Sequence, residues 1–349
     1  MECTGVSTLF ASDAEFLAAH PALCSIAGLG EYLPESVLTN DQLASQLDTT
    51  DAWIVERTGI RERHCADAAE ATSDLALRAA TEALADAGVG ASELDLILLA
   101  TSTADSPVPA TACHLQAKLG SLGVPAMDVS AGCSGFGYAL HVASGLVRAG
   151  MHRRVLVVGA DCLTRITNYA DRQTCILFGD GAGAAVISPD GFLDVIYSDI
   201  GADGTSADMI RVQAGGSRKP ACNATVDASL HTLELRGREV FKAAVRQMSD
   251  CLIRAAEVIG VRTTDFDLII PHQANARIID AVGVQIGADP ARLINDVSGI
   301  GNTAAGSIPL ALTRARKAGL VKDGQLVALV GFGAGTAWAC QVIAVRAGG

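Results

Sequence analysis

The chain has 349 residues, of which 50% are hydrophobic and 36 are glycines, and its formal net charge is −12. A chain of this length and composition can bury a large core, and we expect two packed halves of ordinary domain size. The negative charge argues against a nucleic-acid partner, because neutralising a run of phosphates requires a basic surface.

Ten cysteines are scattered along the chain without a Cys-x-x-Cys pair and without the histidine spacing of a zinc site. We therefore expect reduced cysteines and no metal. The first 56 residues contain no Lys or Arg, and no apolar run is long enough to span a membrane. These features predict neither a signal peptide nor a membrane span, and we expect a soluble, cytoplasmic protein.

The amino-terminal part begins with residues 1–24, which show no strand alternation and are interpreted as an added arm. An apolar segment starts at Ser25 and is followed by Thr39-Asn-Asp-Gln, which is typical of a helix start. The segment Asp51–Arg63 contains Trp53 and three arginines around a glycine. Taken alone, this segment indicates a surface turn with a tucked tryptophan.

The chain then alternates predicted helices and buried strands, bounded by Gly, Pro or polar residues. In order these are a helix over 72–88, a strand over 94–101, a helix over 109–120, and strands over 154–160 and 178–187. The glycine run at 178–183 lacks the Lys-Ser/Thr of a P-loop, so it does not predict nucleotide binding.

Between these elements, Met127–Leu140 runs from a short apolar strand through a glycine turn into a helix, with Cys133 at the junction. A thiol at a helix N-terminus faces unpaired N–H groups and the positive end of the helix dipole. We therefore expect a lowered pKa and a nucleophilic thiolate at Cys133. On this stretch alone, a buried structural cysteine is an equal alternative.

The second half of the chain repeats motifs of the first half. The matched pairs are Asp95 with Asp267 and Val157 with Leu329 at an offset of 172, and Asp128-Val-Ser with Asp296-Val-Ser at an offset of 168. Three matches in the same order at half the chain length indicate a duplication. Each half is expected to be a mostly parallel sheet covered by helices.

The duplication also predicts where the reactive groups lie. Applied to the elbow, the offset of 168 places Cys133 opposite Gly301 and Ser134 opposite Asn302. We therefore expect equivalent elbows of the two halves to meet at a pseudo-twofold axis.

Five motifs occur in a characteristic order: Ala131-Gly-Cys-Ser-Gly-Phe136, Phe178-Gly-Asp-Gly-Ala-Gly183, Pro271-His-Gln-Ala-Asn-Ala-Arg277, Gly301-Asn-Thr-Ala-Ala-Gly-Ser-Ile-Pro309 and Gly331-Phe-Gly-Ala-Gly335. With them, the chain resembles the ketoacyl synthase III branch of the thiolase-like condensing enzymes from about 25 to 345. The resemblance implies a five-layered α-β-α-β-α fold with two mixed, mostly parallel sheets. Its nucleophile half would span 25–190, and its His and Asn half 191–349.

The resemblance implies a decarboxylative Claisen condensation that initiates fatty-acid or polyketide synthesis. Cys133 would take an acyl group from acyl-CoA. His272 and Asn302 would then bind the carbonyl of a malonyl thioester and stabilise the enolate formed on loss of CO2. The backbone N–H groups of Cys133 and Ala334 would hold the oxyanion at the acyl carbon, and Phe332 would line the site.

The resemblance also implies a coenzyme A site. Trp53 and Arg172 match the pair that sandwiches the adenine, and Gly237 lies where pantetheine passes close to the backbone. Arg238 replaces an Asn that is common at the pantetheine contact. Val108 matches a residue that reaches across a dimer interface to the partner's acyl pocket, and its small size predicts primers beyond acetyl.

The implied partners are acyl-CoA, used as a substrate with no separate cofactor, a second copy of the chain in a homodimer, and malonyl-acyl carrier protein. Arg277, Lys242 and Arg246 would form a thin basic patch for the acidic carrier protein. The helix after Arg277 carries Val284 and Gln285, where family members that use carrier proteins often have basic residues. The acceptor is therefore less well defined than the chemistry.

Other functions remain open on the sequence. A related acyltransferase would move the acyl group from Cys133 to an alcohol, an amine or a second acyl-CoA. A degradative thiolase would need a second cysteine in Gly331–Gly335, which contains none. A silent partner subunit would have no chemical need for the Cys-His-Asn trio, and a NAD-dependent oxidoreductase would need a Gly-x-Gly-x-x-Gly motif after its first strand.

Overall fold

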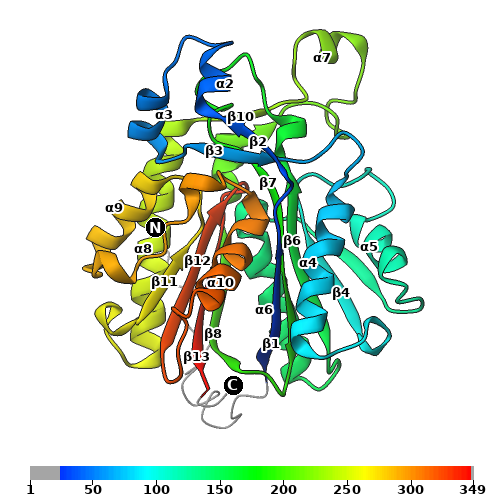
Figure 1. The fold of residues 1–349 in the computed structure, drawn as a ribbon, viewed down its shortest axis with the longest axis vertical. Coiled ribbons are helices and arrows are strands. Elements are labelled where there is room, and N and C mark those ends of the chain that lie inside the picture. The colour runs from blue at the N-terminus through cyan, green and yellow to red at the C-terminus, as the bar shows by residue number, and fades with distance from the viewer. Residues whose placement is uncertain (1–23, 347–349) are drawn as a thin grey trace, which may run out of the picture.

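The computed structural model describes residues 24–346, so the predicted amino-terminal arm lies outside the described residues except for Cys24. Figure 1 shows strands flanked by helices along the whole chain. In chain order the first half contains β1 (Ser25–Tyr32), β2 (Ser36–Thr39), α2 (Asn40–Ala44), α3 (Asp51–Thr58), β3 (Glu62–Cys65), α4 (Thr72–Ala87), β4 (Leu96–Ala100), α5 (Thr111–Leu119), β5 (Ala126–Val129), α6 (Gly135–Arg148), β6 (Val155–Cys162) and β7 (Asp180–Ser188).

The second half contains β8 (Leu193–Ala202), β9 (Ile210–Val212), α7 (Asn223–Asp227), β10 (Leu233–Leu235), α8 (Gly237–Ile259), β11 (Leu268–Pro271), α9 (Ala276–Ile286), α10 (Ser307–Lys317), β12 (Leu326–Gly333) and β13 (Ala337–Val345). The boundary that we expect between residues 190 and 191 falls in the link between β7 and β8.

Local sequence signals explain several element ends. Thr39 caps α2 with a capping box, as the Thr39-Asn-Asp-Gln motif predicts. Gly88 and Gly120 end α4 and α5 in the left-handed conformation that glycine adopts at little cost. The surface turn expected around Trp53 is wrong, because Thr50 accepts a hydrogen bond from the Trp53 N–H (3.1 Å) and starts helix α3 there.

The strands confirm the duplication in detail. Their order in the large sheet is β11-β12-β13-β8-β1-β7-β6-β4-β5. Counted outward from the centre, β1-β7-β6-β4 of the first half corresponds to β8-β13-β12-β11 of the second half, and β5 extends the first half by one strand. Leu96 pairs with Val155 in the first half, and Leu268 pairs with Val327 in the second. Leu268 and Val327 follow Leu96 and Val155 by 172 residues, so the strand pairing of the two halves has the same register at an offset of 172.

The sheet differs from the expectation in two respects. β1 and β8 pair through Ser25 with Asp194 and Ile26 with Leu193, which joins two expected sheets edge to edge. The sheet is also less parallel than expected, because only β4–β5, β4–β6 and β11–β12 are parallel among the neighbouring pairs of the large sheet. The later strands β7 and β13 turn back beside β6 and β12, which periodicity alone does not reveal.

Three large hydrophobic cores lie among the layers of the molecule, as expected for the five-layered thiolase-like fold. One core lies between α4 and α5 and the outer face of the first-half strands, and another between α8 and α9 and the second-half strands. The third surrounds α6 and α10, which lie between the two halves of the sheet (Figure 1). Both elbows that lead into α6 and α10 are therefore held at the centre of the molecule.

The elbows correspond at the offset of 172, so the expected equivalence of Cys133 with Gly301 is wrong. A 3-10 turn η2 (Gly132–Ser134) precedes α6, and η8 (Ala304–Gly306) precedes α10. Gly132 and Ala304 open these turns with φ angles of 54° and 44°. Cys133 therefore corresponds to Ala305. The loop after Asp296 is four residues longer than the loop after Asp128, and this longer loop carries Asn302.

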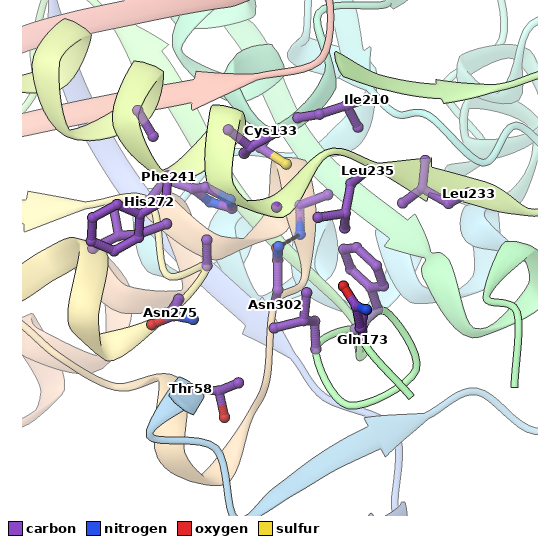
Figure 2. A pocket seen from close by; sticks show the side chains of 18 of the residues that line it. Thr58, Cys133, Gln173, Ile210, Leu233, Leu235, Phe241, His272, Asn275 and Asn302 are labelled. Carbon is purple, nitrogen blue, oxygen red and sulfur yellow. Dashed lines mark hydrogen bonds between the residues drawn. The ribbon is translucent and has the colours of Figure 1, made fainter. Parts of the chain in front are cut away.

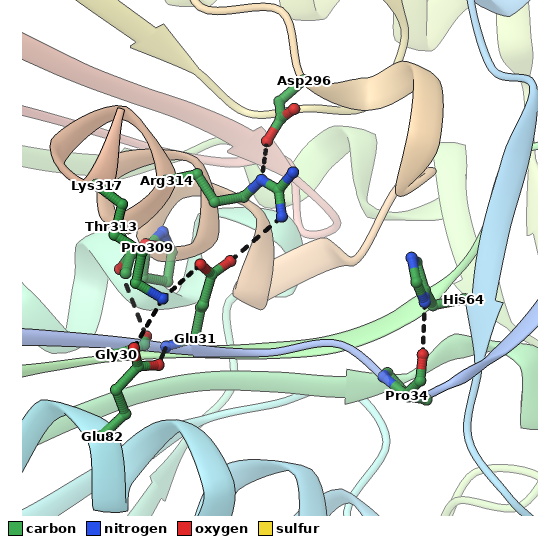
Figure 3. Close-up of polar contacts among 10 residues, drawn as sticks. All are labelled: Gly30, Glu31, Pro34, His64, Glu82, Asp296, Pro309, Thr313, Arg314 and Lys317. Atoms are coloured by element: carbon green, nitrogen blue, oxygen red, sulfur yellow. Dashed lines mark hydrogen bonds and ion pairs between the residues drawn. The ribbon is translucent and has the colours of Figure 1, made fainter. Parts of the chain in front are cut away.

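A cluster of ion pairs connects α10 in the second half with β1 and α4 in the first half (Figure 3). Lys317 lies 2.8 Å from Glu31 and 2.7 Å from Glu82. Arg314 lies 2.6 Å from Asp296 and 3.5 Å from Glu31. Since these side chains are partly exposed, each pair adds little stability by itself, but together they fix the orientation of α10.

Candidate active site

A cavity of about 740 Å³ opens between the two halves and receives side chains from both. Its lining includes Cys133 from the first half and His272, Asn302 and Phe332 from the second half. His272, Asn302 and Phe332 are buried, whereas Cys133 is partly accessible. The structure therefore brings the predicted catalytic trio together, although the three residues lie up to 169 positions apart.

The elbow at Cys133 packs backbone to backbone against the end of β12. A Cβ atom on Gly132 would lie 2.7 Å from the nitrogen of Ala334, and one on Gly333 would lie 2.4 Å from the nitrogen of Cys133. Only glycine permits approaches this close. The two predicted oxyanion donors, the N–H groups of Cys133 and Ala334, consequently lie on neighbouring backbone segments.

The expected low pKa of Cys133 is wrong for the structure described. Burial, with a smaller effect from the charge of Asp161, raises the pKa of the thiol to about 12. Cys133 precedes Ser134, the N-cap of α6, and therefore lies outside the first helical turn. The loss of water around the sulfur outweighs the backbone hydrogen bond that lowers the pKa of the thiol.

His272 is held as a neutral imidazole. Burial lowers its pKa to about 3, so the ring carries no charge near neutral pH. Its Nδ1 atom lies 2.5 Å from the hydroxyl oxygen of Ser307, which also accepts a hydrogen bond from the N–H of Gln273 at 3.4 Å. The Ser307 proton is thus available to Nδ1, which favours the tautomer with the ring proton on Nε2.

Asn302 is held from several sides. Its side-chain oxygen accepts a hydrogen bond from the N–H of Ala304 at 2.9 Å, which leaves the amide NH2 group as a donor. Its backbone N–H bonds the carbonyl of Leu177 (2.8 Å), and its carbonyl accepts from the N–H of Gly179 (3.0 Å). Asn302 is therefore tied to the loop that precedes β7 in the first half.

Apolar side chains form one wall of the cavity beside Cys133. Figure 2 shows Leu233, Leu235 and Ile210 on one side of Cys133, with His272 on the other. Leu233 and Leu235 come from β10, which pairs with β9 in a small separate sheet. Phe241 lies on the same side of Cys133 as His272, and Gln173 lies below Leu235 (Figure 2), so both polar and apolar groups are found on each side of the thiol.

The cavity mouth carries positive charge next to an aromatic ring. The guanidinium carbon of Arg172 lies 5.2 Å from the Trp53 ring centre, and that of Arg57 lies 4.6 Å from it. Arg172 also donates to the carbonyl of Asp48 at 2.7 Å. The spacing between Arg172 and Trp53 is too small for an adenine ring, so the expected sandwich requires the exposed Arg172 side chain to move.

The remaining predicted binding residues divide into two groups. Gly237, Arg238, Lys242 and Arg277 line the cavity. Arg246 and Val108 do not line it: Arg246 is exposed one helical turn beyond Lys242, and Val108 is 84% exposed. The four lining residues are therefore placed where a substrate in the cavity could reach them, whereas the roles of Arg246 and Val108 stay predictions.

Two residues that sequence reasoning missed support the site. Ser307 lies inside the predicted motif 301–309, but only the fold brings its hydroxyl to His272. Asp161 is buried at the end of β6 and affects the pKa of Cys133, and no sequence motif indicated it. Within residues 24–346, no group of His, Cys, Asp and Glu could hold a metal ion, and no helix is long and apolar enough to cross a membrane.

A duplicated α/β fold that brings a cysteine of one half together with a histidine and an asparagine of the other defines a thiolase-like condensing enzyme, which is an acyltransferase. The family model for 3-oxoacyl-[acyl-carrier-protein (ACP)] synthase III matches residues 127–204, and the model for the C-terminal part of that enzyme matches residues 256–345. The beta-ketoacyl-[acyl-carrier-protein] synthase III of Caldanaerobacter subterraneus subsp. tengcongensis is 47% identical over 319 residues, which cover 91% of this chain and 96% of that relative. The chain therefore belongs to the 3-oxoacyl-[acyl-carrier-protein] synthase III family.

Solved structures agree with this assignment. The crystal structure of 3-oxoacyl-[acyl-carrier-protein] synthase III from Aquifex aeolicus VF5 is similar with a TM-score of 0.85 and 40% identity, over 92% of this chain and 99% of that one. The priming beta-ketosynthase from the R1128 polyketide biosynthetic pathway has a TM-score of 0.85 and 33% identity, over 93% of this chain and 96% of that one.

Proposed function

We propose that this enzyme condenses an acyl-CoA primer with malonyl-acyl carrier protein and so initiates fatty-acid or polyketide synthesis. The observation that carries the proposal is the meeting of Cys133, His272 and Asn302 in one cavity with an apolar wall. Family membership supports the same reaction, because the relatives are named for the synthesis of 3-oxoacyl-carrier protein.

In the first step, the sulfur of Cys133 attacks the thioester carbonyl of acyl-CoA. The carbon–sulfur bond to coenzyme A breaks, and the thiol proton leaves with the coenzyme A sulfur. The N–H groups of Cys133 and Ala334 stabilise the tetrahedral oxyanion, and each such donor contributes about 2.7–4 kcal/mol. Because burial raises the pKa of the thiol, Cys133 loses its proton during the attack rather than before it.

In the second step, the malonyl thioester loses CO2. The electron pair of the broken carbon–carbon bond forms an enolate, whose oxygen accepts hydrogen bonds from His272 Nε2–H and the Asn302 amide. A neutral imidazole suits this role, since it donates a hydrogen bond without holding the product as an ion pair. The enolate carbon then attacks the acyl carbon, and Cys133 leaves as the thiolate and regains a proton.

The substrates would enter at the charged mouth. Trp53 and Arg172 would bind the adenine, and Gly237 and Arg238 would border the pantetheine. Lys242, Arg246 and Arg277 would orient the acidic carrier protein, since charge complementarity chiefly affects encounter and orientation. A homodimer in which Val108 reaches the partner's acyl pocket fits its exposure in the single chain.

Intact-protein mass spectrometry after incubation with C2 to C8 acyl-CoAs, and then with malonyl-acyl carrier protein or malonyl-CoA, tests this function. The first incubation should add one acyl mass to the native enzyme and none to Cys133→Ala, and primers longer than acetyl should load. The second should remove the acyl mass with release of CO2, faster with the carrier protein. Loading of acetyl alone would refute the primer prediction, and discharge to an alcohol, an amine or acyl-CoA without CO2 would refute condensation.

A further inference from the structure

Asp161, near the end of β6, is a buried carboxylate that the proposed reaction does not use. Its Oδ1 atom accepts hydrogen bonds from the Ser102 N–H (2.7 Å) and the hydroxyls of Thr103 (3.0 Å) and Thr101 (3.1 Å). Its Oδ2 atom accepts the N–H of Ala305 at 3.0 Å. The side chain therefore ties the loop after β4 in the first half to η8 in the second half.

The internal repeat relates this contact to the oxyanion site. The offset of 172 equates Ala305 with Cys133 and Asp161 with Gly333, in the register shared by β6 and β12. A Cβ atom on Gly333 would lie 2.4 Å from the nitrogen of Cys133. The Asp161 side chain thus points to the N–H of Ala305, and a side chain at position 333 would point to the equivalent N–H of Cys133.

We propose that each half carries an equivalent N–H site for a negatively charged oxygen, and that Asp161 fills the site at Ala305 whereas Gly333 keeps the site at Cys133 free for substrate. The inference rests on the proposed function, because the Cys133 site is assigned there to the acylation oxyanion. Asp161 is a positioning residue: it fixes η8, where the N–H of Ala304 holds the side chain of Asn302 at 2.9 Å.

The hydrogen bonds explain why this position requires a carboxylate. Four donors converge on the two oxygens of Asp161. An asparagine of the same shape would turn two N–H bonds toward these donors and leave at least one backbone N–H unpaired. The negative charge of Asp161 also raises the pKa of Cys133 and so opposes ionisation of the nucleophile.

The test compares Asp161→Asn with the native enzyme by iodoacetamide alkylation of Cys133 across pH, followed by peptide mapping. His272 lines the same cavity as Cys133 and is neutral, because burial lowers its pKa to about 3. Removing the charge should shift the alkylation profile to lower pH, because the Asp161 carboxylate raises the pKa of the thiol. Malonyl decarboxylation should fall by about tenfold, because the turn that holds Asn302 loses its anchor.

Asp180→Asn is the matched control. Asp180 is also fully buried and accepts hydrogen bonds from the N–H groups of Ala66 and Thr164 and from the Thr164 hydroxyl, and none of these donors belongs to η8. This variant should lose stability without a shift in the alkylation profile. An Asp161→Asn enzyme with the native profile and native decarboxylation would overturn the proposal. Alkylation needs no substrate, so its outcome holds even if the proposed condensation fails.

Gly333→Ala tests the other half of the inference. The added methyl group must displace the backbone at Cys133, so primer loading should fall by at least about tenfold. Decarboxylation of malonyl-acyl carrier protein should persist, because His272 and Asn302 are untouched. Native loading by a folded Gly333→Ala enzyme, with folding checked by circular dichroism, would overturn the role assigned to Gly333.

Discussion

At the scale of single residues, hydrogen bonds from neighbouring groups leave the two donors of the site free to act. The Ala304 N–H occupies the oxygen of Asn302, so its NH2 group remains for substrate. Ser307 occupies Nδ1 of His272, so Nε2 remains. In both cases a group within 301–309 determines which atom of a neighbouring side chain can donate.

Ser307→Ala is expected to slow condensation by about fivefold, because a typical hydrogen bond of about 1 kcal/mol no longer fixes the imidazole. Primer loading on Cys133 should be unchanged, since Ser307 acts through His272. Rates of CO2 release and of acyl loading, measured separately, check this expectation.

Ser249→Ala provides the control for that variant. Ser249 is also a buried helical serine, but within the described residues its hydroxyl has no hydrogen-bond partner. It should retain native rates of both steps. Equal losses of loading and CO2 release in Ser307→Ala would contradict a role through His272.

At the scale of elements, close packing of helices on strands determines where the elbows lie. Helix α4 lies against β1 so closely that a Cβ atom on Gly30 would be 2.2 Å from the carbonyl oxygen of Ala79. The ion pairs of Lys317 and Arg314 hold α10 on the other side of β1 (Figure 3). Glycine at position 30 thus allows backbone packing on a strand that contacts both halves.

Gly30→Ala should lower stability by about 1–3 kcal/mol, because the methyl group meets backbone atoms that cannot move independently of α4. Gly145→Ala is the control: Gly145 lies exposed within α6 with nothing near its would-be Cβ, and it should gain about 0.5–1 kcal/mol. The midpoint of thermal unfolding checks both variants. A native midpoint for Gly30→Ala would show that the packing is looser than described.

At the scale of the whole molecule, the sequence predicted the duplicated fold and the trio, but it could not predict the environment of the trio. The motifs at Cys133, His272 and Asn302 are local, so they were visible along the chain. The pKa of Cys133 depends on burial and on Asp161, which only packing reveals.

The equivalence of the elbows failed for a different reason. Asp128-Val-Ser and Asp296-Val-Ser match before a loop of unequal length, so the local match gave an offset of 168 where the sheet register has 172. The additional residues in the second half carry Asn302. The two halves thus differ in loop length just before the elbow, where the second half carries Asn302.

The division of chemistry between the halves is tested most directly by measuring both half-reactions in Cys133→Ala, His272→Ala and Asn302→Ala. Acyl loading is followed by intact mass, and CO2 release is followed with malonyl-acyl carrier protein. Cys133→Ala should lose all loading and still release CO2, whereas His272→Ala and Asn302→Ala should load normally and release CO2 about 10²–10³-fold more slowly. Native CO2 release by His272→Ala, or an acyl mass on Cys133→Ala, would contradict the proposed roles.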